Sequence, residues 1–303
     1  MLMRNCFAKL SLFGSLALVL CGCTGDGSGS GMNLGSLTSG VSGMLGKGGN
    51  TGGVDAGAVA NGVQTGVQSF ALSYADEPAM GQSVAAVAIS KYGLVDDPKL
   101  TRYVALVGLT VVSASQNPDA EWFFAVLNTD EVNAFSGPAG YVMITRGAIA
   151  KMHDESELAG VLAHEISHVL NHDGLNAAKH ALLVKGITQA AAGASARFAQ
   201  FEGGTNGALD TIVVNGYNQD QENKADADAV SLVAAAGYDP HGYLHFITRL
   251  AALKHSGGGS IMSTHPGLES RVARISAKIT AIGSPTGQTL EDRFQTRAKD
   301  ALQ

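Results

Sequence analysis

Apolar residues recur at helical spacing over most of the chain beyond residue 66. Spacings of three and four residues predict helices over residues 70–92, 98–115, 154–171, 175–201, 218–236, 241–255 and 268–282. Two short runs, EWFFAVL at 121–127 and YVMIT at 141–145, are typical of strands, with a turn-rich loop expected between them. The pattern predicts an α+β fold that is mostly helical and contains a small β-sheet.

The first 23 residues have the pattern of an export signal. Arg4 and Lys9 precede an apolar run over residues 10–20, which is too short to span a bilayer. The run ends in LCGC, and a cysteine preceded by a small residue is typical of a bacterial lipoprotein signal. Cys23 is therefore the expected lipidation site. A plain cleaved signal peptide is the alternative.

The segment after the signal is dominated by Gly, Ser, Thr and Asn. Such a composition cannot bury enough apolar surface to fold on its own, so residues 24–66 are expected to form a flexible tether. The predicted organisation is a signal peptide over 1–22, a lipidated Cys23 with its tether over 23–66, and a globular domain over 67–303.

Charge and cysteine content exclude several classes of function. The formal net charge is −6 and the chain has no basic cluster, which argues against a nucleic-acid partner. All three cysteines lie within the export signal. The predicted domain therefore has no disulfide, no cysteine metal ligand and no thiol nucleophile.

The segment AHEISHVLNHDG, residues 163–174, carries the strongest chemical signal. His164 and His168 are four residues apart, so on a helix both imidazoles lie on one face and can reach one metal ion. Glu165 lies at the edge of the same face. This H-E-x-x-H pattern supplies two zinc ligands and a general base for a zinc-bound water.

A catalytic zinc ion needs a third protein ligand. His172 is excluded by geometry, because three histidines at successive four-residue spacings spread over about 12 Å of helix. Glu222, at the start of a predicted helix, is the better candidate, and Asp226 one turn later can accept the N–H of a ligand histidine. The alternative is an acidic helix start on the protein surface.

Four ordered blocks carry a family resemblance: NAFSGPAGYVMITRGAI at 133–149, SELAGVLAHEISHVLNHD at 156–173, NQDQENKADADAVSLVAAAGYDP at 218–240 and STHPGLESRVARI at 263–275. They resemble the HtpX-like and CAAX-prenyl-protease-like zinc metallopeptidases of peptidase family M48, and within it the soluble periplasmic lipoprotein branch. The first block departs from the family pattern, because Ala139 stands where the first of two glycines is usual.

The resemblance implies a zincin fold of the gluzincin type, in which the small sheet lies beside the active-site helix. It implies one Zn2+ ion per chain, held by His164, His168 and Glu222. Glu165 is implied as the general base and Asp226 as the partner of a ligand histidine. The sheet edge to which an extended substrate adds is implied to be Tyr141, Val142, Met143, Ile144 and Thr145.

Two residues of the last block have implied roles with open alternatives. His265 is expected near the zinc cleft, where it either stabilises an oxyanion or plugs the open zinc position; the alternative is a capping residue before Pro266. Arg271 is expected to form a buried or cleft salt bridge with an acid of the zinc-site helices, and a surface arginine is the alternative.

The predicted activity is a zinc-dependent endopeptidase that hydrolyses misfolded or unassembled cell-envelope proteins, which it meets as unfolded or extended chains. The lipid on Cys23 would hold the protein at a bacterial membrane, facing the periplasm and at the outer membrane rather than the inner one. An oligomer stays possible. The alternative is an envelope-protein chaperone or assembly factor with a latent or plugged zinc site. A structural zinc is a weaker hypothesis, because such a site does not need Glu165.

Overall fold

The computed structural model describes residues 72–192, 216–255, 265 and 267–302. The predicted signal peptide, Cys23 and the tether lie outside these residues, and so does the end of the helix predicted over 175–201. Within the described ranges, no helix is long and apolar enough to cross a membrane.

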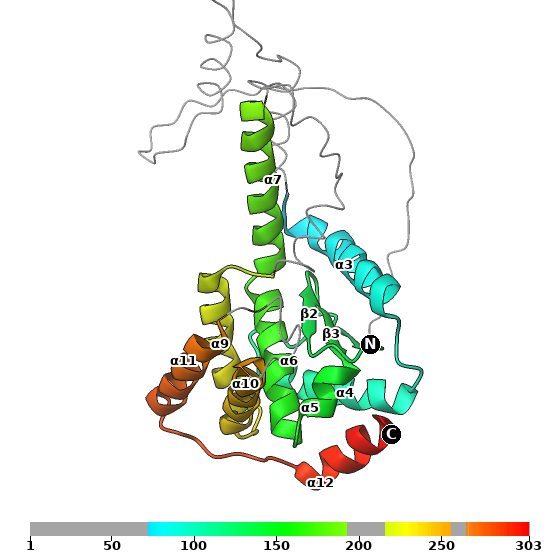
Figure 1. Cartoon of the computed structure of the whole chain (residues 1–303), viewed down its shortest axis with the longest axis vertical. Helices are drawn as coiled ribbons and strands as arrows, with labels where there is room; N and C mark the ends of the chain where they lie inside the picture. The colour runs from blue at the N-terminus through cyan, green and yellow to red at the C-terminus, as the bar shows by residue number, and fades with distance from the viewer. Residues whose placement is uncertain (1–71, 193–215, 256–264, 266, 303) are drawn as a thin grey trace, which may run out of the picture. The chain divides into compact units, whose positions relative to one another are not determined.

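Helices form most of the described structure (Figure 1). They are α3 (Glu77–Tyr92), α4 (Pro98–Ser113), α5 (Arg146–Lys151), α6 (Glu155–Leu170), α7 (Asp173–Ala192), α9 (Gln219–Ala235), α10 (Pro240–His255), α11 (Leu268–Ala281) and α12 (Glu291–Phe294), with short 3-10 or π-helical turns at Tyr74–Asp76, Gln295–Lys299 and Asp300–Leu302. The predicted α+β class, mostly helical, is confirmed. The apolar spacing does not predict α5 and α12, because they are too short to display a period.

The sheet has three strands, β1 (Phe123–Leu127), β2 (Ala134–Gly137) and β3 (Tyr141–Thr145). β3 is the central strand, parallel to β1 and antiparallel to β2, with Phe135 opposite Met143. The prediction that Tyr141–Thr145 forms the substrate-binding edge is therefore wrong, because β3 has a hydrogen-bonded strand on each side. β2 is an edge strand of this sheet, and it packs on α6.

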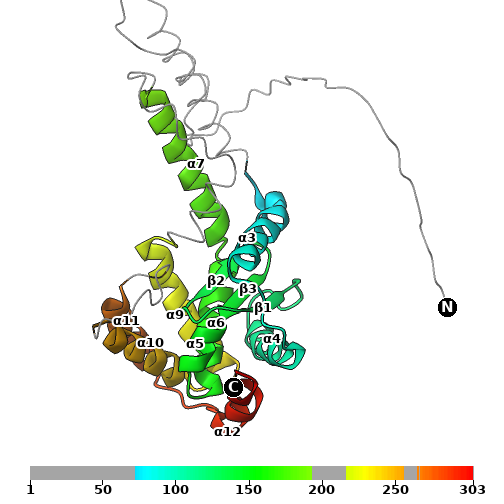
Figure 2. The same cartoon turned by 45° about the vertical axis from the view of Figure 1, so that its right-hand side comes forward.

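α6 runs through the core, between the sheet and the helices α9 and α10 (Figures 1 and 2). Every residue from Glu155 to His168 is buried, as expected for a helix that is covered on all sides. Asp154 caps its first turn, since the Asp154 carboxylate accepts a hydrogen bond from the Glu157 N–H at 3.0 Å. Gly160 permits close approach of α10, because a Cβ there would lie 2.4 Å from the Cβ of Tyr243.

A buried carboxylate joins the start of α6 to the C-terminal segment. Glu155 is fully buried and accepts hydrogen bonds from the hydroxyls of Tyr103 at 2.7 Å and Tyr238 at 2.6 Å. Arg293 of α12 donates two more hydrogen bonds to the same carboxylate. The end of the chain therefore helps to fix the helix that carries the H-E-x-x-H pattern.

Candidate metal centre

α6 directs two histidines at one point. His164 and His168 lie one turn apart, with their Nε2 atoms separated by 3.2 Å, and each is only 1% exposed. Glu165 beside them is fully buried. Leu158, Leu162 and Ile166 of the same helix pack into the apolar core. The polar stripe and the apolar positions of the pattern thus occupy different faces of α6.

α9 and the segment before α11 bring two more donors to this point. Asn218 caps α9, which places Glu222 in the first turn with its Oε1 atom 3.4 Å from Nε2 of His168. Nδ1 of His265 lies 2.8 Å from Oε1 of Glu222 and 3.2 Å from Nε2 of His164. One ligand atom from each of His164, His168, Glu222 and His265 lies within 4.8 Å of the others.

This donor set fits a divalent metal ion. Oε1 of Glu165 and Oε2 of Glu222 are buried without a hydrogen-bond partner. Oε1 of Glu165 lies 3.3 Å from His265, and Oε2 of Glu222 lies 3.5 Å from both His164 and Arg271. A buried carboxylate oxygen in such a place is costly unless a cation compensates it. Imidazole nitrogen and carboxylate oxygen are ligands of zinc and neighbouring transition metals. The buried cluster can therefore hold a metal ion.

Two carboxylates orient the histidines of α6. Nδ1 of His168 lies 2.8 Å from Oδ2 of Asp173, and Nδ1 of His164 lies 3.2 Å from Oδ1 of Asp226. Contact of each Nδ1 with a carboxylate turns each Nε2 toward the common point. Asp226 thus contacts His164, a histidine of the H-E-x-x-H pattern. The sequence analysis assigns no role to Asp173, although this residue ends the family block at 156–173.

Arg271 lies behind the cluster and is fully buried. It donates hydrogen bonds to Oδ1 of Asp226 at 2.8 Å and to the hydroxyl of Tyr243 at 2.7 Å. Its Nη1 atom lies 3.5 Å from Oε2 of Glu222. The alternative of a surface arginine is therefore wrong, and the guanidinium joins α9, α10 and α11 next to the possible ligands.

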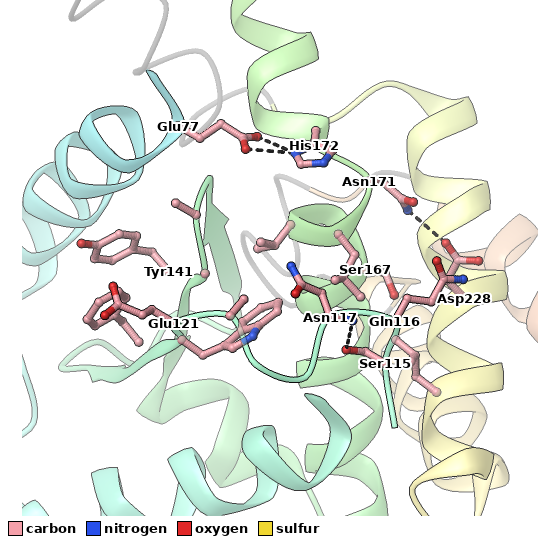
Figure 3. Close-up of a pocket in the computed structure, with 18 of the residues that line it drawn as sticks. Glu77, Ser115, Gln116, Asn117, Glu121, Tyr141, Ser167, Asn171, His172 and Asp228 are labelled. Atoms are coloured by element: carbon pink, nitrogen blue, oxygen red, sulfur yellow. Dashed lines mark hydrogen bonds and ion pairs between the residues drawn. The ribbon is translucent and has the colours of Figure 1, made fainter. Parts of the chain in front are cut away.

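His172 takes no part in the cluster. It follows the C-cap of α6 with a φ of 55°, and its Nδ1 atom lies 2.8 Å from Oε1 of Glu77. Figure 3 shows His172 and Glu77 beside a hollow of about 880 Å³ between α3, the end of α6, α9 and the loop after α4. Neither Glu165 nor any of the four possible ligands lines this hollow, so it is separate from the metal cluster.

The charges within the cluster shift the pKa values of its members. Burial raises the pKa of Glu165, but the nearby imidazoles of His265, His164 and His168 outweigh burial and lower it to about 2. Burial lowers the pKa of His265, but the carboxylates of Glu222 and Glu165 outweigh it and raise this pKa to about 10. Without a metal ion, His265 is therefore an imidazolium between two carboxylates.

Two further side chains contact the cluster although no sequence pattern indicates them. Ser136 of β2 donates a hydrogen bond from its hydroxyl to Oε2 of Glu165 at 2.7 Å. Tyr217, just before α9, donates a hydrogen bond to the backbone carbonyl of Ser136 at 3.1 Å. The Tyr217 ring stacks on His168 with 4.1 Å between the ring centroids. Only the fold brings these residues to the site, since neither belongs to a metal-binding motif.

Comparison with known proteins gives a consistent match. The model of "Peptidase family M48" matches residues 98–279, from α4 to α11. The beta-barrel assembly-enhancing protease of Escherichia coli (strain K12) is 28% identical over 239 residues, which cover 75% of this chain and 49% of that protein. The chain thus spans about half the length of this relative.

Two other relatives carry metalloprotease names. Metalloprotease YcaL of Escherichia coli (strain K12) is 25% identical over 243 residues, which cover 77% of this chain and 91% of YcaL. The mitochondrial metalloendopeptidase OMA1 of Schizosaccharomyces pombe is 26% identical over 207 residues, which cover 66% of this chain and 60% of OMA1. These names agree with a metalloprotease, as the sequence predicts.

Proposed function

The chain belongs to peptidase family M48, and from this premise we propose that it is a zinc-dependent endopeptidase acting on unfolded proteins of the bacterial cell envelope. The observation that carries the proposal is the buried cluster, in which a carboxylate oxygen of Glu165 without a hydrogen-bond partner lies beside the possible ligands of the metal. A structural metal site would not need a second glutamate in this place.

His164, His168 and Glu222 would hold the zinc ion. Two imidazoles and one carboxylate are a ligand set that catalytic zinc sites use, with a fourth position left for water or substrate. Bound zinc supplies Lewis acidity, which lowers the pKa of water and polarises the scissile carbonyl. Asp173 and Asp226 hold the two imidazoles in the orientation that this role requires.

Glu165 is the proposed general base. Its Oε2 atom accepts the hydrogen bond from Ser136, which leaves Oε1 to take a proton from the attacking water. Oε1 then gives the proton to the nitrogen of the leaving amine. The Glu165 carboxyl, whose pKa the neighbouring imidazoles lower, is ionised at neutral pH and has a free site for the proton on Oε1.

An extended polypeptide is the substrate that this sheet favours. β2 ends the sheet beside α6, and its Ser136 touches Glu165, so a chain added along β2 would pass the cluster. Such pairing reads the backbone more than the side chains, which suits misfolded or unassembled substrates. The name of the relative that enhances beta-barrel assembly points to the cell envelope. We propose the same location for this chain. A lipid on Cys23 would hold it at the outer membrane, facing the periplasm.

The position of His265 favours a second candidate function, an assembly factor or chaperone with a latent site. Its ring nitrogens lie 2.8 Å from Glu222 and 3.3 Å from Glu165, in the space that a water molecule and a substrate carbonyl would need. A protein closed in this way would hold extended chains without cleaving them.

The test compares wild-type protein and Glu165→Gln, both loaded with zinc, for hydrolysis of unfolded casein and for zinc content. We expect the variant to retain one zinc ion per chain and to lose activity by roughly 100-fold or more, as for loss of a general base. Full residual hydrolysis would contradict the proposed role of Glu165. Faster hydrolysis by His265→Ala would indicate a latent protease, and no hydrolysis by any form would favour the chaperone.

A further inference from the structure

The outer edge of β2 is the place where the proposed substrate would add. The Thr145 N–H donates to the carbonyl of Asn133 at 3.0 Å, which fixes how the two strands are paired. Hydrogen bonding alternates along an antiparallel pair. Phe135 and Gly137 therefore direct their backbone groups at β3, whereas Ala134 and Ser136 direct theirs outward. The outward carbonyl of Ser136 belongs to the residue whose hydroxyl donates a hydrogen bond to Glu165 at 2.7 Å.

A side chain occupies this carbonyl. The hydroxyl of Tyr217 donates to it at 3.1 Å, in the position that the N–H of an added strand would take. Tyr217 is only 7% exposed, and its ring stacks on that of His168 with the two planes inclined by 30°. Tyr217 thus contacts the strand edge and the metal cluster at the same time.

We propose that Tyr217 is a substrate-positioning residue that closes the edge of β2 until a backbone N–H of the substrate displaces its hydroxyl from the Ser136 carbonyl. This inference rests on the proposed function. A chain with a free N–H at this point replaces the hydrogen bond that it breaks. A chain whose N–H is already bonded in secondary structure, or is absent as in proline, does not replace it. Replacement of the Tyr217 hydroxyl by a substrate N–H therefore favours extended segments whose backbone N–H groups are not already hydrogen-bonded.

The first measurement is binding without cleavage, in zinc-loaded Glu165→Gln protein. The probe is a fluorescein-labelled decapeptide from casein, followed by fluorescence anisotropy. Tyr217→Phe keeps the ring and its stacking but loses the hydroxyl, so we expect the Kd to fall roughly two- to tenfold, the worth of one hydrogen bond. The matched control is Tyr92→Phe, which removes a hydroxyl from a ring that stacks on Phe135 of the same strand, and it should leave the Kd unchanged.

The second measurement replaces one amide of the probe at a time by an ester, which removes the N–H and adds no bulk. We expect a weaker Kd at one or two positions of the peptide, because the outward carbonyls of Ala134 and Ser136 can each accept a substrate N–H. Equal affinity of all the ester peptides, or an unchanged or weaker Kd in Tyr217→Phe, overturns the inference. If the thermal melt shows that Tyr217→Phe is unfolded, the ester series in protein with Tyr217 intact decides whether a substrate N–H takes the place of its hydroxyl.

Kinetics on casein separate this role from a catalytic one. In the protein with Glu165 intact, Tyr217→Phe should lower KM and leave kcat unchanged. A fall in kcat at constant KM would mean that the hydroxyl acts on the reacting atoms, and it would overturn the positioning role. If neither the wild-type protein nor His265→Ala hydrolyses casein, the proposed protease is wrong, while the peptide-binding result still decides the role of Tyr217.

Discussion

Ala139 has a backbone conformation that side chains rarely adopt. It lies in the turn between β2 and β3 with a φ of 58°, at the position where the family pattern favours glycine. An alanine in this left-handed region destabilises the folded state by about 1–2 kcal/mol. Glycine removes that strain, but its greater freedom stabilises the unfolded chain by about 0.4–1 kcal/mol. Ala139→Gly should therefore raise the free energy of unfolding by roughly 0.5 kcal/mol, measured by urea denaturation.

The control for Ala139→Gly is Ala277→Gly, an exposed position inside α11 where the same change should cost about 1 kcal/mol. If both variants lose stability to a similar degree, the backbone at Ala139 is not strained.

His265 carries a proton in the metal-free protein at neutral pH, because its pKa is raised to about 10 by the carboxylates around it. A metal ion at the cluster must displace that proton, since the two cations would share one small buried space. Wild-type protein should thus release about one more proton per zinc ion at pH 7.5 than His265→Ala. Titration calorimetry in buffers of different ionisation enthalpy counts the protons. Equal counts would show that His265 is neutral before the metal binds.

The sequence predicts the side chains whose roles depend on local spacing. His164, Glu165 and His168 lie on one helix, so their mutual arrangement follows from the helical period. Glu222 comes from a distant helix, and its assignment needed the family resemblance as well as its position in the chain. Ser136, Asp173 and Tyr217 reach the site only through tertiary packing, and serine, aspartate and tyrosine at single positions have no distinctive pattern.

At the scale of elements, α12 is held by the buried ring of Phe294 and by one ion pair. Arg293 of α12 is half exposed, whereas its partner Glu155 is fully buried at the start of α6. Arg293→Ala would leave a buried carboxylate with only tyrosine hydroxyls. We expect a loss of about 1–3 kcal/mol in the free energy of unfolding at pH 7, below the usual loss for a buried pair because Arg293 is hydrated. The exposed Arg297→Ala in the same segment should be nearly neutral.

The same pair gives a pH dependence with a definite sign. Burial raises the pKa of Glu155, but its hydrogen bonds from Arg293 and two tyrosines outweigh burial and lower it from the ordinary 4.5. A lowered folded-state pKa contributes stability above the ordinary value, and this contribution is lost as the pH falls below it. The difference in the free energy of unfolding between wild type and Arg293→Ala should therefore be largest at pH 7 and smaller at pH 3. An equal difference at both pH values would mean that the charge of Glu155 is not involved.

The sheet was the element-scale feature that sequence patterns described least well. The strand predicted over YVMIT is confirmed. It is buried over nearly its whole length, as is typical of a central strand with neighbours on both sides. The pattern predicts a loop over AFSG, because a four-residue strand shows no clear alternation and Pro138 follows it in a tight turn. Which strand forms the edge depends on this missed strand, so the error about the substrate edge followed from it.

At the scale of the whole molecule, the candidate metal centre connects parts of the chain that are far apart in sequence. Its donors come from α6, α9 and the segment before α11. A metal ion that binds only the folded protein stabilises it by about 4 kcal/mol at a free concentration of 1,000 Kd. A domain of 150–250 residues gains roughly 2–4 °C in Tm per kcal/mol. Zinc should therefore raise the Tm by roughly 8–16 °C over protein treated with EDTA.

Two buried glutamates of this cluster allow metal binding to be separated from proton transfer. Glu222→Gln removes a proposed ligand, so most of the zinc-dependent rise in Tm should disappear. Glu165→Gln removes only the proposed base, so the rise in Tm should remain while casein hydrolysis is lost. Both side chains are at most 1% exposed and undergo the same change from acid to amide, which makes each the control for the other. If Glu165→Gln abolished the rise and Glu222→Gln kept it, the two roles would have to be exchanged.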